Sequence, residues 1–236
     1  MVQFFYSTQI YDDSIILPED EALHALKVLR KKNGDQVTVV DGKGNLYYTS
    51  IDTEDIKDCR LSIISEEQDY GRPNYYIHIG IAPPKSHDRV EWFVEKSIEI
   101  GVQEISFILT ENSERNNLKL NRIGKRAVSA MKQSLKAYLP QINDIVPIKN
   151  FMKICGNSEK YIAHLNEDEY THLINSKTSA KDYCILIGPE GDFSSSEINE
   201  SAEYGFKPVS LGNNRLRTET AGIASCHIFN LVNESE

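Results

Sequence analysis

The sequence predicts an α/β protein in which a small N-terminal β-barrel precedes a mainly parallel sheet with helices on both faces. Short strand-like segments separated by turn residues fill the first 70 residues, as is typical of a small barrel. After Gly71-Arg-Pro73, apolar strands alternate with amphipathic helices, a pattern that favours a parallel sheet. We therefore expect one domain over residues 1–70 and a second over 74–236.

The N-terminal elements are predicted from apolar alternation and turn residues. The expected strands share this pattern and lie at 4–7, 36–41, 46–52 and 60–66. The segment Asp41-Gly-Lys-Gly-Asn45 is a hairpin turn between two of them. One helix over 19–29 collects its leucines on one side and ends in a cationic turn before Gly34.

The C-terminal elements follow from changes of periodicity. Strands are expected at 77–82, 104–109, 144–148, 161–165, 184–187 and 208–211, and helices at 89–100, 121–139, 194–205 and 218–232. Gly101 and Pro140 mark two helix ends, and Ser194 with Glu197 forms a capping-box signature. In such a sheet, ligands bind beyond the carboxyl ends of the strands.

Composition limits the function classes. No apolar run approaches the roughly 20 residues of a membrane span, and the N-terminus is strand-like, so we expect a soluble protein without a signal peptide. The four cysteines are scattered without metal-ligand spacing, which predicts no metal site and a reducing cytoplasm.

The net charge of −9 conceals an uneven distribution. Residues 71–150 carry 12 basic and 8 acidic side chains, whereas both flanking parts are acidic. The cations run from Arg115 to Lys136 with Glu114 as the acidic exception. A solvated helix face is the ordinary interpretation of such a run, and an RNA-facing surface is the more specific one.

Two later strands break at glycines, in Leu186-Ile-Gly-Pro-Glu-Gly-Asp-Phe193 and in Leu211-Gly-Asn-Asn-Arg-Leu-Arg-Thr-Glu-Thr-Ala221. Either these are ordinary turns or they form a ligand site built from backbone, which glycine allows a ligand to approach closely. The phosphate-binding GxxxxGK[ST], the dinucleotide-binding GxGxxG, GxSxG and HExxH are all absent. Catalysis would therefore depend on a bound cosubstrate and hydrogen bonds.

These two motifs, the basic helix with Ala130-Met-Lys-Gln-Ser134, and Glu95-Lys-Ser-Ile-Glu-Ile-Gly101 closely resemble the RsmE family across nearly the whole chain. Members of that family are SPOUT-class methyltransferases that methylate N3 of one uridine in 16S ribosomal RNA. The resemblance implies a PUA-like N-terminal barrel, a C-terminal trefoil knot, S-adenosylmethionine (SAM) as cosubstrate and a homodimer. Asp192 departs from the family pattern, which usually has glycine there.

The resemblance also implies the site residues. The expected SAM-binding residues are Leu165, Ile187, Gly188, Pro189, Glu190, Gly191, Leu211, Gly212, Asn214 and Leu216. Arg217 is the candidate that stabilises the uridinate, and Glu219 or Glu190 the candidate proton acceptor. Each glutamate also has a structural interpretation, since Glu219 suits the positive start of a helix and Glu190 could simply shape its loop.

The expected partner is 16S ribosomal RNA in the small ribosomal subunit. The expected RNA-binding residues are Arg30, Arg115, Arg122, Lys125, Arg126 and Lys132. Two alternatives remain open: another SPOUT RNA methyltransferase that acts on a ribose 2′-hydroxyl or on tRNA, and a noncatalytic RNA-binding ribosome assembly factor.

Overall fold

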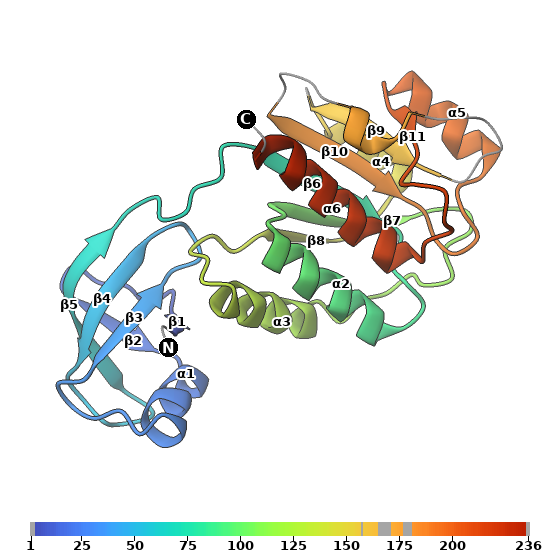
Figure 1. The fold of residues 1–236 in the computed structure, drawn as a ribbon. Helices are drawn as coiled ribbons and strands as arrows, with labels where there is room; N and C mark the ends of the chain where they lie inside the picture. Colours follow the sequence, from blue (N-terminus) through green and yellow to red (C-terminus); the bar gives the residue numbers. More distant parts are fainter. Residues whose placement is uncertain (1–2, 157, 165–170, 177–180, 235–236) are drawn as a thin grey trace. The chain divides into compact units, whose positions relative to one another are not determined.

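The computed structural model describes residues 3–156, 158–164, 171–176 and 181–234. The chain divides into two compact units (Figure 1). The first comprises Met1–Arg72 with Val128–Leu139, and the second comprises Pro73–Ala127 with Pro140–Glu236. The expected boundary at residues 70–74 lies close to one of these junctions, and the return of 128–139 to the first unit was not predicted.

The first unit contains a curled five-stranded sheet, a half-barrel, in the order β1-β3-β4-β5-β2 (Figure 1). Its strands are β1 (Phe4–Tyr6), β2 (Ser14–Leu17), β3 (Gln36–Val40), β4 (Leu46–Ile51) and β5 (Cys59–Glu67). Strand β2 was missed because it has four residues, but its alternating Ile15 and Leu17 are buried in the core of this unit. The small N-terminal β-domain predicted from the sequence is confirmed.

The predicted helix at 19–29 divides into two parts. Helix α1 (Glu19–Leu23) continues as the π-helix η1 (His24–Val28), with Leu29 N–H donating to His24 O at 3.0 Å. The wider turn ends at Arg30, whose φ of 56° is in the left-handed region. The expected glycine stop at Gly34 therefore lies beyond the end of the helix, and Arg30 itself reverses the chain.

The second unit contains a six-stranded sheet in the order β11-β9-β10-β6-β7-β8, in which each neighbouring pair is parallel. Its strands are β6 (Tyr76–Ile81), β7 (Glu104–Leu109), β8 (Gln141–Pro147), β9 (Glu159–Ala163), β10 (Asp182–Ile187) and β11 (Lys207–Val209). The central strand β10 is buried over all but its first residue, as expected for a strand covered on both faces. The predicted parallel sheet is confirmed.

Helices cover both faces of this sheet (Figure 1). Helix α2 (His87–Ile100) packs on α6 (Thr218–Glu234), which lies against β6 and β10. On the opposite face, α4 (Ile148–Ile154) packs against β7 and β8, and its buried side chains share a core with those near α5 (Ser195–Glu203). Two predicted helix ends are confirmed: Gly101 terminates α2 at φ 128°, and Ser194 caps α5 with a complete capping box.

Helix α3 (Leu120–Gln133) ends six residues before the end of the predicted helix at 121–139. Leu135, with a φ of 55°, adopts the left-handed conformation usually reserved for glycine, and Lys136 N–H donates to Met131 O at 3.0 Å. The prediction that Pro140 stops this helix was therefore wrong. Across the described residues, no helix combines the length and apolar character needed to cross a membrane.

Candidate active site

A cavity of about 310 Å³ lies at the carboxyl edge of the sheet, beyond the adjacent strands β9, β10 and β11. Both glycine loops contribute to its wall. The lining residues are Ala163, His164, Ile187, Gly188, Pro189, Glu190, Asp192, Val209, Ser210, Leu211, Gly212, Asn214, Arg215, Leu216, Arg217, Thr218 and Ala221. The size falls within the range typical of small-molecule sites, at the edge where parallel sheets bind ligands.

The first glycine loop is held in one shape by its surroundings. Asp192 N–H donates to Pro189 O at 2.9 Å, which closes a turn. The amide of Asn112, beyond strand β7, donates to Gly191 O at 3.2 Å and to Asp192 O at 3.0 Å. A Cβ on Gly188 would lie 3.1 Å from the Phe193 ring, so a side chain would crowd this close turn. The loop is therefore preorganised before any ligand arrives.

Asp192 occupies a backbone position that favours glycine. Its φ is 62°, in the left-handed region, which aspartate tolerates better than most residues. Its Oδ1 accepts a hydrogen bond from Phe193 N–H at 2.8 Å. This geometry lets aspartate occupy a backbone position suited to glycine, and the half-buried Asp192 lines the cavity wall.

The second loop joins β11 to α6. Gly212 has a φ of 114°, a conformation open to glycine alone, and its N–H donates to Ser210 Oγ at 3.1 Å. Arg215 and Arg217 follow on the exposed side of the cavity wall, and α6 begins at Thr218. The tight turn therefore presents two guanidinium groups at the cavity entrance.

The two candidate proton acceptors lie in different environments. Glu190 is exposed on the cavity wall, and its Oε1 accepts from Lys85 N–H at 3.4 Å. Glu219 does not line the cavity: its side chain is 6% exposed, and its Oε1 lies 3.5 Å from Nε of Arg89 on α2. Glu219 therefore lies in the first turn of α6 and faces the contact between α2 and α6.

The remaining expected SAM-binding residues are placed as follows. Those on the cavity wall are Ile187, Gly188, Pro189, Glu190, Leu211, Gly212, Asn214 and Leu216. Gly191 belongs to the first loop but is not on the wall, and Leu165 lies outside the described residues. The sequence interpretation did not include His164 and Ser210, because the predicted strands 161–165 and 208–211 extended over them, whereas β9 and β11 end just before them.

Arg115, expected to bind RNA, is engaged within the protein. Its guanidinium donates to Pro84 O at 3.1 Å and to Lys85 O, and it lies 2.9 Å from Nε2 of His87. Partial burial and this guanidinium hold the pKa of His87 below its usual value. Arg115 therefore fastens its own segment to the loop after β6.

Two more of the expected RNA-binding arginines form ion pairs with α2. Arg122 pairs with Glu91, and Arg126 reaches Glu91 at 3.5 Å and Glu95 at 3.1 Å. Glu91 is buried, so both arginines compensate a charge removed from water. Lys125 is exposed and has no ion pair within the part of the chain that the structure describes. Within α3, Lys125 is therefore the cation most available to a phosphate.

The other two expected cations belong to the first unit. Lys132 pairs with the buried Glu21. Arg30 is exposed at the end of the π-helix, beside the exposed Val28 and Leu29. Arg30 is thus available to a ligand, whereas Lys132 is committed to a structural pair.

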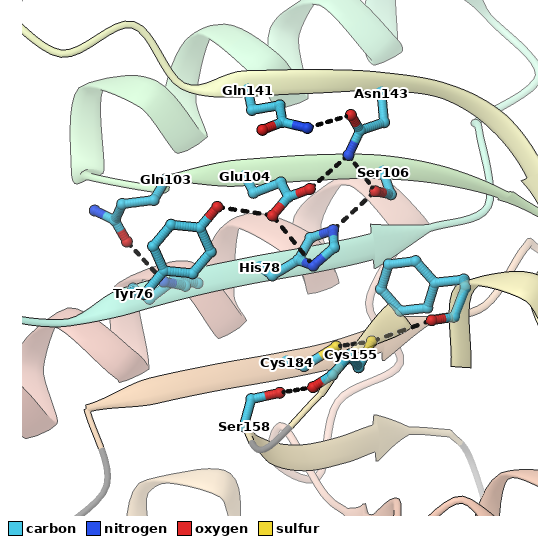
Figure 2. A network of polar contacts seen from close by, with 12 residues as sticks. Tyr76, His78, Gln103, Glu104, Ser106, Gln141, Asn143, Cys155, Ser158 and Cys184 are labelled. Atoms are coloured by element: carbon cyan, nitrogen blue, oxygen red, sulfur yellow. Dashed lines mark hydrogen bonds and ion pairs between the residues drawn. The ribbon is translucent and has the colours of Figure 1, made fainter. Parts of the chain in front are cut away.

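A second polar group lies inside the sheet, near the amino ends of β6 and β7 (Figure 2). His78 Nδ1 lies 3.5 Å from Glu104 Oε2, and its Nε2 lies 2.8 Å from Ser106 Oγ. Asn143 donates to both Glu104 and Ser106, at 2.6 and 2.8 Å, and Tyr76 donates to Glu104 at 2.7 Å. Burial lowers the pKa of His78, outweighing the opposite effect of Glu104.

Two thiols lie below this histidine (Figure 2). The Sγ atoms of Cys184 and Cys155 lie 2.6 Å apart, and Cys155 donates to Phe151 O at 3.4 Å. Burial, then the contact with Cys155, raises the pKa of Cys184 well above its usual value. The possible ligand atoms of His78, Cys155 and Cys184 lie within 4.8 Å of one another, a cluster that the sequence did not reveal. Both histidine nitrogens are already engaged by Glu104 and Ser106, so the site is built as a hydrogen-bond network.

The cavity and fold define the class of protein. The model of the RNA methyltransferase domain matches residues 72–230, and that of the RNA methyltransferase PUA domain matches residues 17–51. The chain belongs to the RNA methyltransferase family, and the methyltransferase activity and PUA-like N-terminal domain predicted from the sequence are confirmed.

Its relatives narrow this class. The ribosomal RNA small subunit methyltransferase E of Aquifex aeolicus is 30% identical over 95% of this chain and 97% of its own. A probable rRNA-methyltransferase from Porphyromonas gingivalis has a TM-score of 0.93 at 40% identity, with 99% of each chain covered. The methyltransferase E of Neisseria gonorrhoeae, bound to S-adenosyl methionine, has a TM-score of 0.86 at 25% identity, covering 96% of this chain and 95% of that one.

Proposed function

We propose that this protein transfers the methyl group of SAM to N3 of one uridine in the 16S ribosomal RNA of the small subunit. The observation that carries the proposal is the cavity, because both glycine loops and Arg217 meet there at the carboxyl edge of the sheet. The proposal is supported by relatives named as small-subunit methyltransferases and by a SAM-bound structural neighbour.

The residues present suit SAM. Ile187, Leu211 and Leu216 provide apolar wall for an adenine ring, and the turn at Gly212 leaves backbone groups accessible to its polar edge. Carboxylates and guanidinium groups on the same wall suit a ligand that carries both charges. SAM supplies an activated methyl group when bound, so the protein has to align the base and manage one proton.

Arg217 stabilises the negative charge that develops on the uracil when N3 loses its proton. Its guanidinium is exposed at the cavity wall and offers fixed donors to an oxygen of the base. Glu190 accepts the proton, because it is on the same wall while Glu219 is held in the contact of α2 with α6. Glu219 has the separate role of orienting the start of α6, which carries Thr218 into the cavity wall.

The target base has to be unpaired or flipped out, since N3 is on its Watson–Crick edge. Lys125 and Arg30, both exposed, provide RNA contacts in this proposal. Arg115, Arg122, Arg126 and Lys132 shape the surface through the ion pairs and hydrogen bonds described above, with the exposed parts of Arg122 and Arg126 adding positive potential.

We also infer that the protein acts in the cytoplasm, as a homodimer with a trefoil knot around the SAM site. Leu231 on α6 is 39% exposed, and the apolar Ile223, Ala224 and Ile228 on the same helix are half-buried, which suits a subunit contact. Sedimentation of the purified chain tests this dimer: a monomer at micromolar concentration contradicts it.

The cytoplasmic location is supported by the four free cysteines, which suit a reducing compartment.

Incubation with tritiated SAM and small subunits from a strain without its own enzyme tests the function. Label in one 16S fragment as N3-methyluridine, with a reverse-transcription stop at that site, is the expected result. Label on a ribose or in tRNA would favour another RNA methyltransferase. Absence of SAM binding at millimolar concentration would favour a noncatalytic assembly factor.

A further inference from the structure

Asp192 brings a negative charge to the cavity wall at a position whose backbone is best suited to glycine. We propose that this carboxylate makes the cavity select the cationic methyl donor over the neutral product that remains after transfer. The inference rests on the proposed function and adds a specificity role for a residue that the expected site did not include.

The backbone and the side chain of Asp192 both make hydrogen bonds within the loop region. Its backbone N–H closes the turn to Pro189 O, its backbone O accepts from the amide of Asn112, and its own Oδ1 accepts from Phe193 N–H. The carboxylate is half-buried, and these bonds limit the directions it can take. A fixed charge at the wall of a partly enclosed cavity interacts with a bound ion more strongly than a fully solvated one.

The two ligands of a methyltransferase differ in charge at one atom. SAM has a positive sulfonium, whereas S-adenosylhomocysteine (SAH), formed when the methyl group leaves, has a neutral thioether. A carboxylate at the wall stabilises the sulfonium and offers the thioether no comparable interaction. The cavity with Asp192 therefore holds the substrate and releases the product more readily, and product inhibition is weakened.

The other charged groups of the wall are less suited to this selection. Glu190 on the same wall is exposed, so solvent screens its charge more strongly than that of a half-buried group. Arg215 and Arg217 are exposed cations on the opposite loop and oppose any bound cation. Asp192 is the half-buried carboxylate on this wall, so it carries the larger part of the discrimination.

Two substitutions separate the charge of Asp192 from its role in the turn. Asp192→Asn keeps the left-handed conformation and the acceptor for Phe193 N–H but removes the charge. Asp192→Gly also suits a φ of 62° and removes the side chain. Glu203→Gln on α5 is the control, because it neutralises an exposed carboxylate of the same unit that does not line the cavity. Calorimetry gives the dissociation constants for SAM, SAH and an analogue with a protonated amine in place of the sulfonium.

We expect both Asp192 variants to lower the preference for SAM over SAH by about fivefold, which is the effect of losing a partly exposed ion pair. The preference for the amine analogue over SAH should fall by a similar factor. Glu203→Gln should change this preference by less than twofold. An unchanged preference in Asp192→Asn, with SAM still bound, overturns the inference but not the proposed function. Failure of the unmodified protein to bind SAM overturns both.

Discussion

The sheet of the second unit has two polar regions that differ in how their groups are paired. At the carboxyl edge, Glu190, Arg215 and Arg217 are exposed around a cavity. Near the amino ends of β6 and β7, His78 and Glu104 are packed among partners that occupy both histidine nitrogens. The second region contains the residue types usual in active sites, histidine, cysteine and glutamate, yet its polar groups are engaged by one another.

This difference teaches that pairing, more than residue type, separates a reactive site from a structural one. A buried polar group costs free energy unless it is hydrogen-bonded, so the network around His78 stabilises the fold by being complete. The groups around the cavity remain accessible to a ligand. The same contrast recurs in α3, where Arg126 is paired with two glutamates and Lys125 is exposed.

The largest effect is expected at the cavity. Arg217→Ala should lower the rate of methyl transfer by about 10²- to 10³-fold, because a donor to the developing anion is lost. SAM affinity should stay within threefold, as measured by calorimetry beside single-turnover kinetics. Arg217→Lys retains the charge without the planar fork and should recover part of the rate. An unchanged rate in Arg217→Ala would contradict this role and would assign the stabilisation of the anion to another cation.

A substitution in the network around His78 should lower the free energy of unfolding without changing SAM affinity. His78→Gln should lower the free energy of unfolding at pH 7.5 by about 1–3 kcal/mol, because Glu104 and Ser106 lose a buried partner. The SAM dissociation constant should not change. Weaker SAM binding with unchanged stability would contradict the separation of the two regions.

The same histidine predicts a pH dependence. The pKa of His78 is lower in the folded than in the unfolded protein. Its contribution to the free energy of unfolding is therefore complete above about pH 6.5, and it is lost as the pH falls toward the pKa of the folded state. Thermal unfolding between pH 7.5 and 5.5 should therefore show a smaller loss of stability in His78→Gln than in the unmodified protein. A loss of the same size in both would contradict this assignment.

Within α3, substitutions of the paired cations should lower stability, whereas substitution of the unpaired cation should weaken RNA binding. Arg122→Ala combined with Arg126→Ala should lower stability by about 1–2 kcal/mol, because the buried Glu91 loses its partners while the arginines themselves are half exposed. Lys125→Ala should keep the melting temperature. The same substitution should weaken RNA binding several-fold. It should also reduce by about 1 the magnitude of the salt slope, which is the slope of the logarithm of the RNA binding constant against the logarithm of the salt concentration. A salt slope unaltered by Lys125→Ala would remove it from the RNA surface.

The smallest effect is expected at Glu219. Glu219→Gln keeps an acceptor for Arg89 and should change the methyl-transfer rate by less than tenfold. Loss of a general base would cost about 10²- to 10⁴-fold. The matched variant Glu190→Gln should show the larger loss, and the reverse order would return Glu219 to the role of proton acceptor.

Much of the local structure was predictable because its causes are local. Ser194 and Glu197 form their capping box within one turn, and Gly101 ends α2 through its own positive φ. The end of α3 was not predictable in this way, since Leu135 adopts a left-handed conformation that leucine avoids when isolated. The two glycine loops were recognised as short motifs at strand ends, whereas the pairing of Glu219 with Arg89 joins two helices far apart in sequence.

The sequence by itself determined the alternation of strands and helices, the two glycine loops and the family to which they belong. These features depend on periodicity and on the φ angles that glycine permits, and both are properties of short segments. Only the tertiary structure decided which charges are free. Arg115, Arg122 and Lys125 look alike along the chain. In the folded protein, Arg115 binds Pro84 O and Arg122 pairs with Glu91, whereas Lys125 is exposed to solvent. Burial and pairing depend on that assembly, and they are what distinguish the cavity from the buried network.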